Sequence, residues 1–181
     1  MTLISASVAA SAAAQLPLGP NREPAGAIFT AAGLLLPHLE RGERVDAAAL
    51  RVAMETAFGA SDATGAWDWK TAYDACEAAT VLFLRKYGRA LFRKAGSPAA
   101  RLSALSKIAN LLPTHTRRST ESQTFQQFST PIPLGLVAAH AAAITPADRV
   151  LEPSAGTGLL AILAEIAGGA LVLNELADTR A

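Results

Sequence analysis

The residues best able to do chemistry lie at 150–161, where a short apolar run leads through the loop Glu-Pro-Ser-Ala-Gly-Thr-Gly into a second apolar run. Gly156 and Gly158 have no Cβ, so the backbone there can turn tightly and approach a ligand closely. The second run predicts a helix whose free amino-terminal N–H groups face the loop. A further apolar run at 170–173 is followed by Glu175. Strand, glycine loop, helix, strand and acid, in this order, are typical of half of a nucleotide-type binding site.

Three interpretations of this loop remain open. The spacing Gly156-x-Gly158-x-x-Ala161 fits a dinucleotide fingerprint, and Glu175 stands at roughly the right distance to accept ribose hydroxyls. Glu152 favours S-adenosylmethionine instead, because a carboxylate there would repel a diphosphate but suits an ammonium and a sulfonium. An ordinary strand-to-helix turn is the third interpretation. A Walker loop is excluded, because no Lys follows the second glycine.

Three short motifs resemble those of one enzyme class. Residues 128–131, Phe-Ser-Thr-Pro, resemble the motif that precedes the first strand in amino-methylating DNA methyltransferases and lines their S-adenosylmethionine pocket. Residues 152–158 resemble the first motif of these enzymes, of the type D/E-P-x-x-G-x-G, and Asn174-Glu175 resembles their second. This resemblance implies S-adenosylmethionine as the cofactor.

A broader likeness extends over residues 67–181. This stretch looks like the N-terminal part of large bacterial methylase/helicase proteins, in which a methyltransferase domain precedes a strawberry notch-like helicase. The likeness rests on the segments GAWDWK at 65–70, FLRKYG at 83–88 and LPTHTRR at 112–118. It implies a protein that methylates DNA, with an adenine amine as the expected target, and that couples this to a helicase.

The resemblance also implies roles for individual residues. Thr130 and Pro131 should line the methionine end of the cofactor, Glu152 should face its ammonium group, and Glu175 should hold the ribose. The full set of expected cofactor-binding residues is Phe128, Thr130, Pro131, Glu152, Ser154, Ala155, Gly156, Gly158 and Glu175.

No catalytic residue can be assigned from this sequence. Transfer to an exocyclic amine in this class implies a motif N/D-P-P-Y/F that holds the flipped base, and the sequence contains no Pro-Pro pair. We therefore expect an incomplete methyltransferase domain. Its expected partners are the missing C-terminal methyltransferase portion and the helicase portion. Alone it should have no transferase activity.

The expected fold class is α/β, with a helical N-terminal domain followed by the first two β-α units of a Rossmann-like methyltransferase domain. The boundaries are a flexible tail at 1–23, a helical domain at 24–113, a hinge at 114–124 and the truncated methyltransferase portion at 125–181.

Within the helical part, a first helix should run from Pro24 towards His38, carry Phe29 on its apolar face, and end or kink at Pro37. Asp46 should cap a second helix, which stops at Gly59.

A third helix carries an apolar stripe and should end at Gly88, with a short helical piece following to Ala95. Ser97-Pro98 should start a fourth helix, terminated by Pro113.

The net charge of +1 conceals a basic segment. From Arg85 to Arg118 there are nine Lys and Arg residues and no Asp or Glu. Such a segment is typical of phosphate-backbone binding, although a solvated helical face has the same composition. The expected nucleic-acid contacts, with DNA as partner, are Arg85, Lys86, Arg89, Arg93, Lys94, Arg117 and Arg118.

The composition excludes several classes of protein. Cys76 is the only cysteine, so neither an internal disulfide nor a zinc cluster is expected, and its place on an apolar helix face predicts an inert buried thiol. The longest apolar stretch, 25–36, is shorter than the ~20 residues that span a membrane. These features favour a bacterial cytoplasmic protein without a metal.

The alternative function is a basic helical adaptor that docks nucleic acid or a partner and carries a vestigial nucleotide loop.

Overall fold

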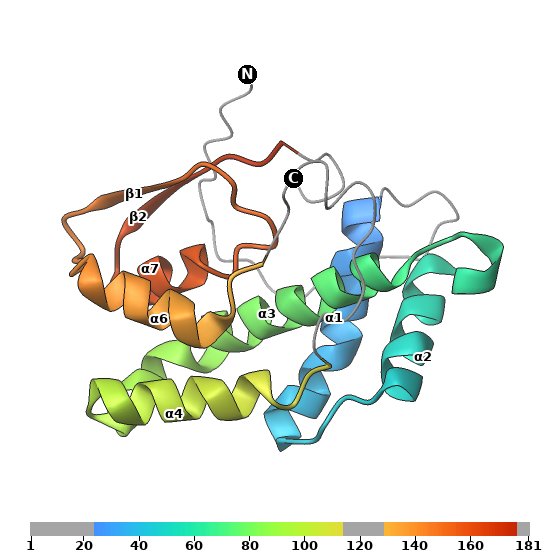
Figure 1. Cartoon of the computed structure of the whole chain (residues 1–181), viewed down its shortest axis with the longest axis horizontal. Coiled ribbons are helices and arrows are strands. Elements are labelled where there is room, and N and C mark those ends of the chain that lie inside the picture. The colour runs from blue at the N-terminus through green and yellow to red at the C-terminus, as the bar shows by residue number, and fades with distance from the viewer. Residues whose placement is uncertain (1–23, 114–128, 177–181) are drawn as a thin grey trace.

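The chain, in a computed structural model, is described at residues 24–113 and 129–176. The described residues are mostly helical, with two short parallel strands (Figure 1). The elements are α1 (Pro24–Arg41), α2 (Ala47–Phe58), a 3₁₀ turn (Asp62–Thr64), α3 (Trp69–Ala95), α4 (Pro98–Ala109), α6 (Ile132–Ala141), β1 (Arg149–Glu152), α7 (Ala161–Ala167) and β2 (Ala170–Leu173). The expected tail at 1–23, the expected hinge at 114–124, and Phe128, Arg117 and Arg118 lie outside the described residues.

Of the two outcomes predicted for Pro37, an end or a kink, the end is wrong. Proline removes one backbone N–H from the helix, but the helix continues through it to Arg41. The additional turn buries Leu39, which is 3% exposed. Burial of this side chain offsets the hydrogen bond that proline cannot make.

Helix α2 begins and ends as its sequence predicts. The Asp46 carboxylate accepts a hydrogen bond from the Ala49 N–H at 2.8 Å. At the other end Gly59 adopts a φ of 75°, and its N–H donates to the Glu55 carbonyl. The buried face of α2 consists of Leu50, Ala53, Met54 and Ala57.

Helix α3 is one continuous helix of 27 residues, so the predicted end at Gly88 was wrong. Gly88 instead allows close packing between α3 and α7. A Cβ built on it would lie 2.5 Å from Ile166 Cδ1 on α7. The missing side chain therefore lets α7 approach α3.

Helix α4 starts as predicted, because Ser97 Oγ accepts from the Ala100 N–H at 3.2 Å and Pro98 occupies the first turn. The helix itself ends at Ala109, before Pro113.

The two predicted strands are present and parallel, with Arg149 opposite Ala170 and Glu152 opposite Leu173. Helix α7 connects them, and it lies with α6 between the strands and the pair α3 and α4 (Figure 1). Because parallel strands end at the same edge, the loops that follow β1 and β2 meet there.

The apolar core has two clusters. One joins α1, α2 and α3 around Leu35, Leu50 and Met54. The other draws on both described ranges, with Leu84, Leu105, Ile108, Ile132, Ile162 and Leu163 buried together. The helical part and the strand-bearing part therefore share a core, and the second forms against the first.

Within the described ranges, no helix is long and apolar enough to cross a membrane. Nor do these ranges contain a group of three or more His, Cys, Asp or Glu side chains able to hold a metal ion.

Candidate functional site

The glycine loop between β1 and α7 takes a conformation that requires glycine. Gly156 has a φ of 54° and Gly158 a φ of 84°, in the left-handed region that side chains disfavour. The Gly158 N–H donates to the Ala155 carbonyl at 2.8 Å and closes a tight turn. The loop then delivers the chain into α7, whose first residue is Ala161.

Backbone and side-chain hydrogen bonds fasten this loop to the end of β2. The Asn174 N–H donates to the Glu152 carbonyl at 2.9 Å, and the Ala155 N–H donates to the Asn174 carbonyl at 2.8 Å. The Asn174 side chain adds a bond from Nδ2 to the Pro153 carbonyl at 2.9 Å. The segments after β1 and β2 thus form one rigid edge.

Glu175 lies directly over the loop. Its Oε2 accepts a hydrogen bond from the Gly156 N–H at 2.6 Å, and its Oε1 accepts one from the Leu176 N–H at 3.0 Å. The carboxylate is thereby held in one orientation beside the glycine backbone. This arrangement brings together the two features that the sequence placed 19 positions apart.

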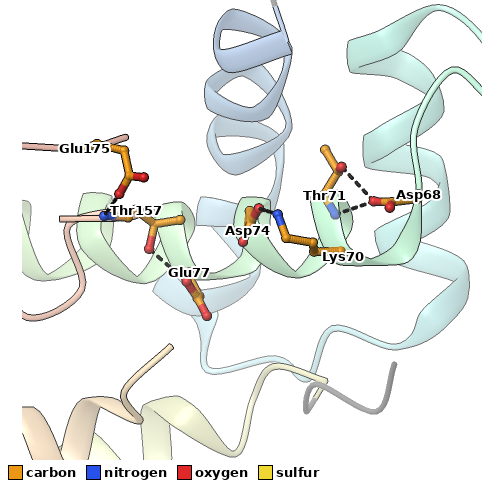
Figure 2. A network of polar contacts seen from close by, with 8 residues as sticks. Asp68, Lys70, Thr71, Asp74, Glu77, Thr157 and Glu175 are labelled. Atoms are coloured by element: carbon orange, nitrogen blue, oxygen red, sulfur yellow. Dashed lines mark hydrogen bonds and ion pairs between the residues drawn. The ribbon is translucent and has the colours of Figure 1, made fainter. Parts of the chain in front are cut away.

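Helix α3 supports the loop from the opposite side. The Thr157 hydroxyl donates to Glu77 Oε2 at 2.8 Å, and Figure 2 shows the two side chains pointing toward each other. Glu77 is 8% exposed. Glu77 was not among the residues predicted from the sequence. The signal that could have found it is an acid beside Cys76 in an apolar helix, because a buried carboxylate needs donors.

The glycine loop forms part of a cavity of about 370 Å³. Loop residues, α7 and β2 line one side, and side chains of α1 and α3 line the other. The volume falls in the range of small-molecule sites, about 300–1,000 Å³. The helical part therefore supplies one wall of the site.

Phe29 lines this cavity and is 62% exposed, so it does not lie on the buried apolar face of α1 as predicted. The buried face of α1 passes through Ile28, Ala32 and Leu35, which turn toward the first core cluster. Phe29 follows Ile28 by one position, about 100° around the helix, and so falls on the side of the cavity.

The charges around the cavity are mostly paired. Arg85 on α3 donates to both oxygens of Glu165 on α7, at 3.2 and 2.9 Å. This fork-to-carboxylate geometry neutralises the only Lys or Arg among the described lining residues. Glu175 contributes a further negative charge.

Four of the predicted cofactor residues line the cavity, namely Ala155, Gly156, Gly158 and Glu175. Four others in the described ranges, Thr130, Pro131, Glu152 and Ser154, are not among its lining residues.

Pro131 stands at the start of α6, and Thr130 precedes it. Glu152 Oε1 accepts a hydrogen bond from the Ser154 N–H at 3.4 Å, so this acid folds back onto the beginning of the loop.

Two of the predicted nucleic-acid contacts lie in ion pairs that the sequence could not reveal. Arg85 pairs with Glu165, and Lys86 pairs with Glu40 on α1 at 2.7 Å. Hydrogen bonds from Lys86 and then from Tyr87 lower the pKa of Glu40. The acids come from distant parts of the chain and reduce the charge of the basic segment.

The other basic residues of α3 differ in their surroundings. Arg89 donates weakly to the Glu165 carbonyl at 3.4 Å. Arg93 and Lys94 are exposed, and within the described ranges neither forms an ion pair. Contact of these residues with nucleic acid stays a prediction.

The single cysteine is not among the described residues that line the cavity. Cys76 is buried in the first core cluster, and burial raises the pKa of its thiol to about 12, with the neighbouring Glu77 charge adding to the rise. The predicted inert thiol is consistent with this environment.

Compared with known protein families, with curated proteins and with solved structures, the chain finds no match in any of the three.

Proposed function

We propose that this chain is the cofactor-binding part of an S-adenosylmethionine-dependent methyltransferase with a Rossmann-like fold, and that DNA is the substrate of the complete enzyme. The proposal for this chain is limited to binding, because the sequence holds no Pro-Pro pair with which to hold a target base.

The observation that carries the proposal is the position of Glu175. A carboxylate held 2.6 Å from the Gly156 N–H stands at the carboxyl edge of two parallel strands, where nucleosides bind in folds of this kind. It can accept hydrogen bonds from both hydroxyls of a ribose laid against the glycine loop.

The lining of the cavity suits the adenine ring. The apolar side chains along it include Phe29 on α1, Val81 on α3 and Ile162 on α7. An exposed aromatic ring at a cavity wall offers a stacking surface for a purine. We assign the adenine to the space between Phe29 and the glycine loop.

The charges favour S-adenosylmethionine over a dinucleotide. A diphosphate needs unpaired cations or free N–H groups, but Arg85 is neutralised by Glu165, and the Gly156 N–H is taken by Glu175. A ligand that carries a sulfonium and an ammonium fits a site with excess negative charge.

The methionine end and the DNA remain assigned by resemblance. Thr130, Pro131 and Glu152 would contact the methionine moiety when it extends beyond the cavity. Arg89, Arg93 and Lys94 would provide the backbone contacts to DNA, which are sensitive to salt.

The test is calorimetric titration of the chain with S-adenosylhomocysteine, with NAD as the competing ligand. We expect saturable binding of S-adenosylhomocysteine, and Glu175→Ala should weaken it at least tenfold because the ribose loses its acceptor. Glu43→Ala is the matched control, since this exposed acid pairs with Arg41 away from the loop. It should leave the affinity unchanged.

Binding of NAD in preference to S-adenosylhomocysteine would refute the proposal in favour of a dinucleotide site. An equal loss of affinity in both variants would show that Glu175 has no specific role.

A further inference from the structure

A second cavity of about 430 Å³ lies among α3, α4, α6 and α7. Ile144, just before β1, and Ala167, just before β2, line it. It therefore lies at the amino edge of the strands, whereas the glycine loop lies at their carboxyl edge. The two cavities share no lining residue among those described, so this one is separate from the proposed cofactor site.

Four basic or titratable groups surround the second cavity. Arg89 and Arg93 come from α3, Arg101 from α4, and His140 from the last turn of α6. Among the described lining residues there is no Asp or Glu. Three guanidinium groups with no facing carboxylate give this concave surface a strong positive potential.

Arg101 is held in place by two contacts with Phe92. Its Nε donates to the Phe92 carbonyl at 3.2 Å, and its guanidinium lies over the Phe92 ring, 5.4 Å from the centroid. The Nε contact leaves the two terminal nitrogens as donors on the same planar group. A guanidinium fixed in this way loses little conformational entropy when it binds an anion.

Much of the remaining lining of the cavity is apolar. Phe92 from α3, Leu136 from α6 and Leu163 from α7 line it, together with Ile144 and Ile166. A bare inorganic anion would leave this surface uncovered. A ligand with an anionic head and an apolar or planar body would match both the arginines and the apolar lining.

We propose that this second cavity binds a phosphomonoester attached to a planar organic body, the chemistry of a nucleoside monophosphate or of the phosphorylated end of a DNA strand. A phosphomonoester carries nearly two negative charges at neutral pH and presents three oxygens, which match three guanidinium forks. The proposed methyltransferase function uses Arg89 and Arg93 of this cavity as backbone contacts to DNA, and it uses none of the other described lining residues.

The experiment is calorimetric titration of the full chain with adenosine 5′-monophosphate at constant ionic strength, with inorganic phosphate and adenosine as partial probes. Adenosine 5′-monophosphate should bind at least tenfold more tightly than either part. A short DNA strand with a 5′-phosphate, compared with the same strand lacking it, distinguishes a strand end from a free nucleotide as the source of the phosphate.

Two adjacent residues provide a matched pair of variants. Arg93→Ala removes a cavity arginine, and Lys94→Ala removes the same charge from the next position of α3, outside the described lining. Both side chains are exposed, so both variants should fold. We expect Arg93→Ala to weaken adenosine 5′-monophosphate binding about tenfold and Lys94→Ala to change it less than twofold.

Glu175→Ala separates this site from the first one. Binding of adenosine 5′-monophosphate should survive Glu175→Ala, and binding of S-adenosylhomocysteine should survive Arg93→Ala. If instead Glu175→Ala abolishes nucleotide binding, the nucleotide occupies the glycine-loop cavity and the proposal fails. Equal losses of affinity in Arg93→Ala and Lys94→Ala would show that the nucleotide is attracted only by the general positive charge, and the proposal would fail. The absence of saturable binding at millimolar nucleotide would also overturn the proposal.

Discussion

The Thr157 hydroxyl donates to the Glu77 carboxylate at 2.8 Å across 80 positions of the sequence. Thr157 belongs to the glycine loop, and Glu77 belongs to the middle of α3. The bond gives a nearly buried carboxylate a donor, and it fixes the loop against the helical part (Figure 2). The conformation of the loop therefore depends on a contact with α3, which is distant from the loop in the sequence.

Thr157→Val should destabilise the chain by about 1–3 kcal/mol, because it replaces the hydroxyl with a methyl group and takes a donor from a buried carboxylate. Urea unfolding followed by circular dichroism measures the change. Thr157→Ser is the control, since it keeps the hydroxyl and should cost less than about 1 kcal/mol. Equal stability of the Val variant and the wild type would show that the Glu77 bond contributes nothing.

The sequence predicted the backbone around the glycine loop. Two glycines between two apolar runs were sufficient to predict the turn and the parallel strands. These features depend on backbone conformation and on the direction of parallel strands, which short patterns specify. The start and the end of α2 follow from Asp46 and Gly59 for the same reason. The cofactor roles of Glu175 and of the other predicted residues stay predictions.

Long-range packing was not accessible from these patterns. Gly88 looks like a helix stop until α7 is placed against it, and Phe29 looks like a core residue until the cavity is formed. In the sequence Arg85 and Lys86 have no nearby acidic residue, because their ion-pair partners Glu165 and Glu40 are distant along the chain. In each case the deciding neighbour comes from another element.

Gly88→Ala should lower the stability of the chain by about 1 kcal/mol. Alanine favours the helix by up to about 1 kcal/mol, but its Cβ would meet Ile166 Cδ1 at 2.5 Å, and such overpacking typically costs about 1–3 kcal/mol. Thermal unfolding measures the net effect. Ile166→Val removes the nearest clashing atom and leaves the Cγ1 contact at 3.2 Å, so in that background Gly88→Ala should destabilise less.

Gly33→Ala in α1 is the matched control for this substitution. Nothing lies within 4 Å of a Cβ built at Gly33, so the helix preference of alanine acts alone and stability should rise by about 0.5–1 kcal/mol. If Gly88→Ala stabilised the chain as much as Gly33→Ala, the close approach of α7 to α3 would be disproved.

Cys76 should resist alkylation in the folded chain at pH 8 and react readily in urea. Burial raises its thiol pKa to about 12, so almost no thiolate forms and access is blocked. The raised pKa favours the folded state fully below the pKa of the unfolded thiol, near 9, and this contribution falls as the pH rises toward 12. Mass spectrometry after iodoacetamide treatment measures the modified fraction. Rapid modification without denaturant would contradict a buried thiol.

The most direct test of the proposed cofactor site is the amide resonance of Gly156 in a ¹H–¹⁵N spectrum during titration with S-adenosylhomocysteine. Its N–H donates to Glu175 at 2.6 Å, and a ribose that engages this carboxylate must change that bond. We predict a saturable shift of the Gly156 resonance, with Gly59 at the end of α2 unmoved as the internal reference. A Gly156 resonance that stays fixed at millimolar S-adenosylhomocysteine, or that moves only with NAD, would contradict the proposed function.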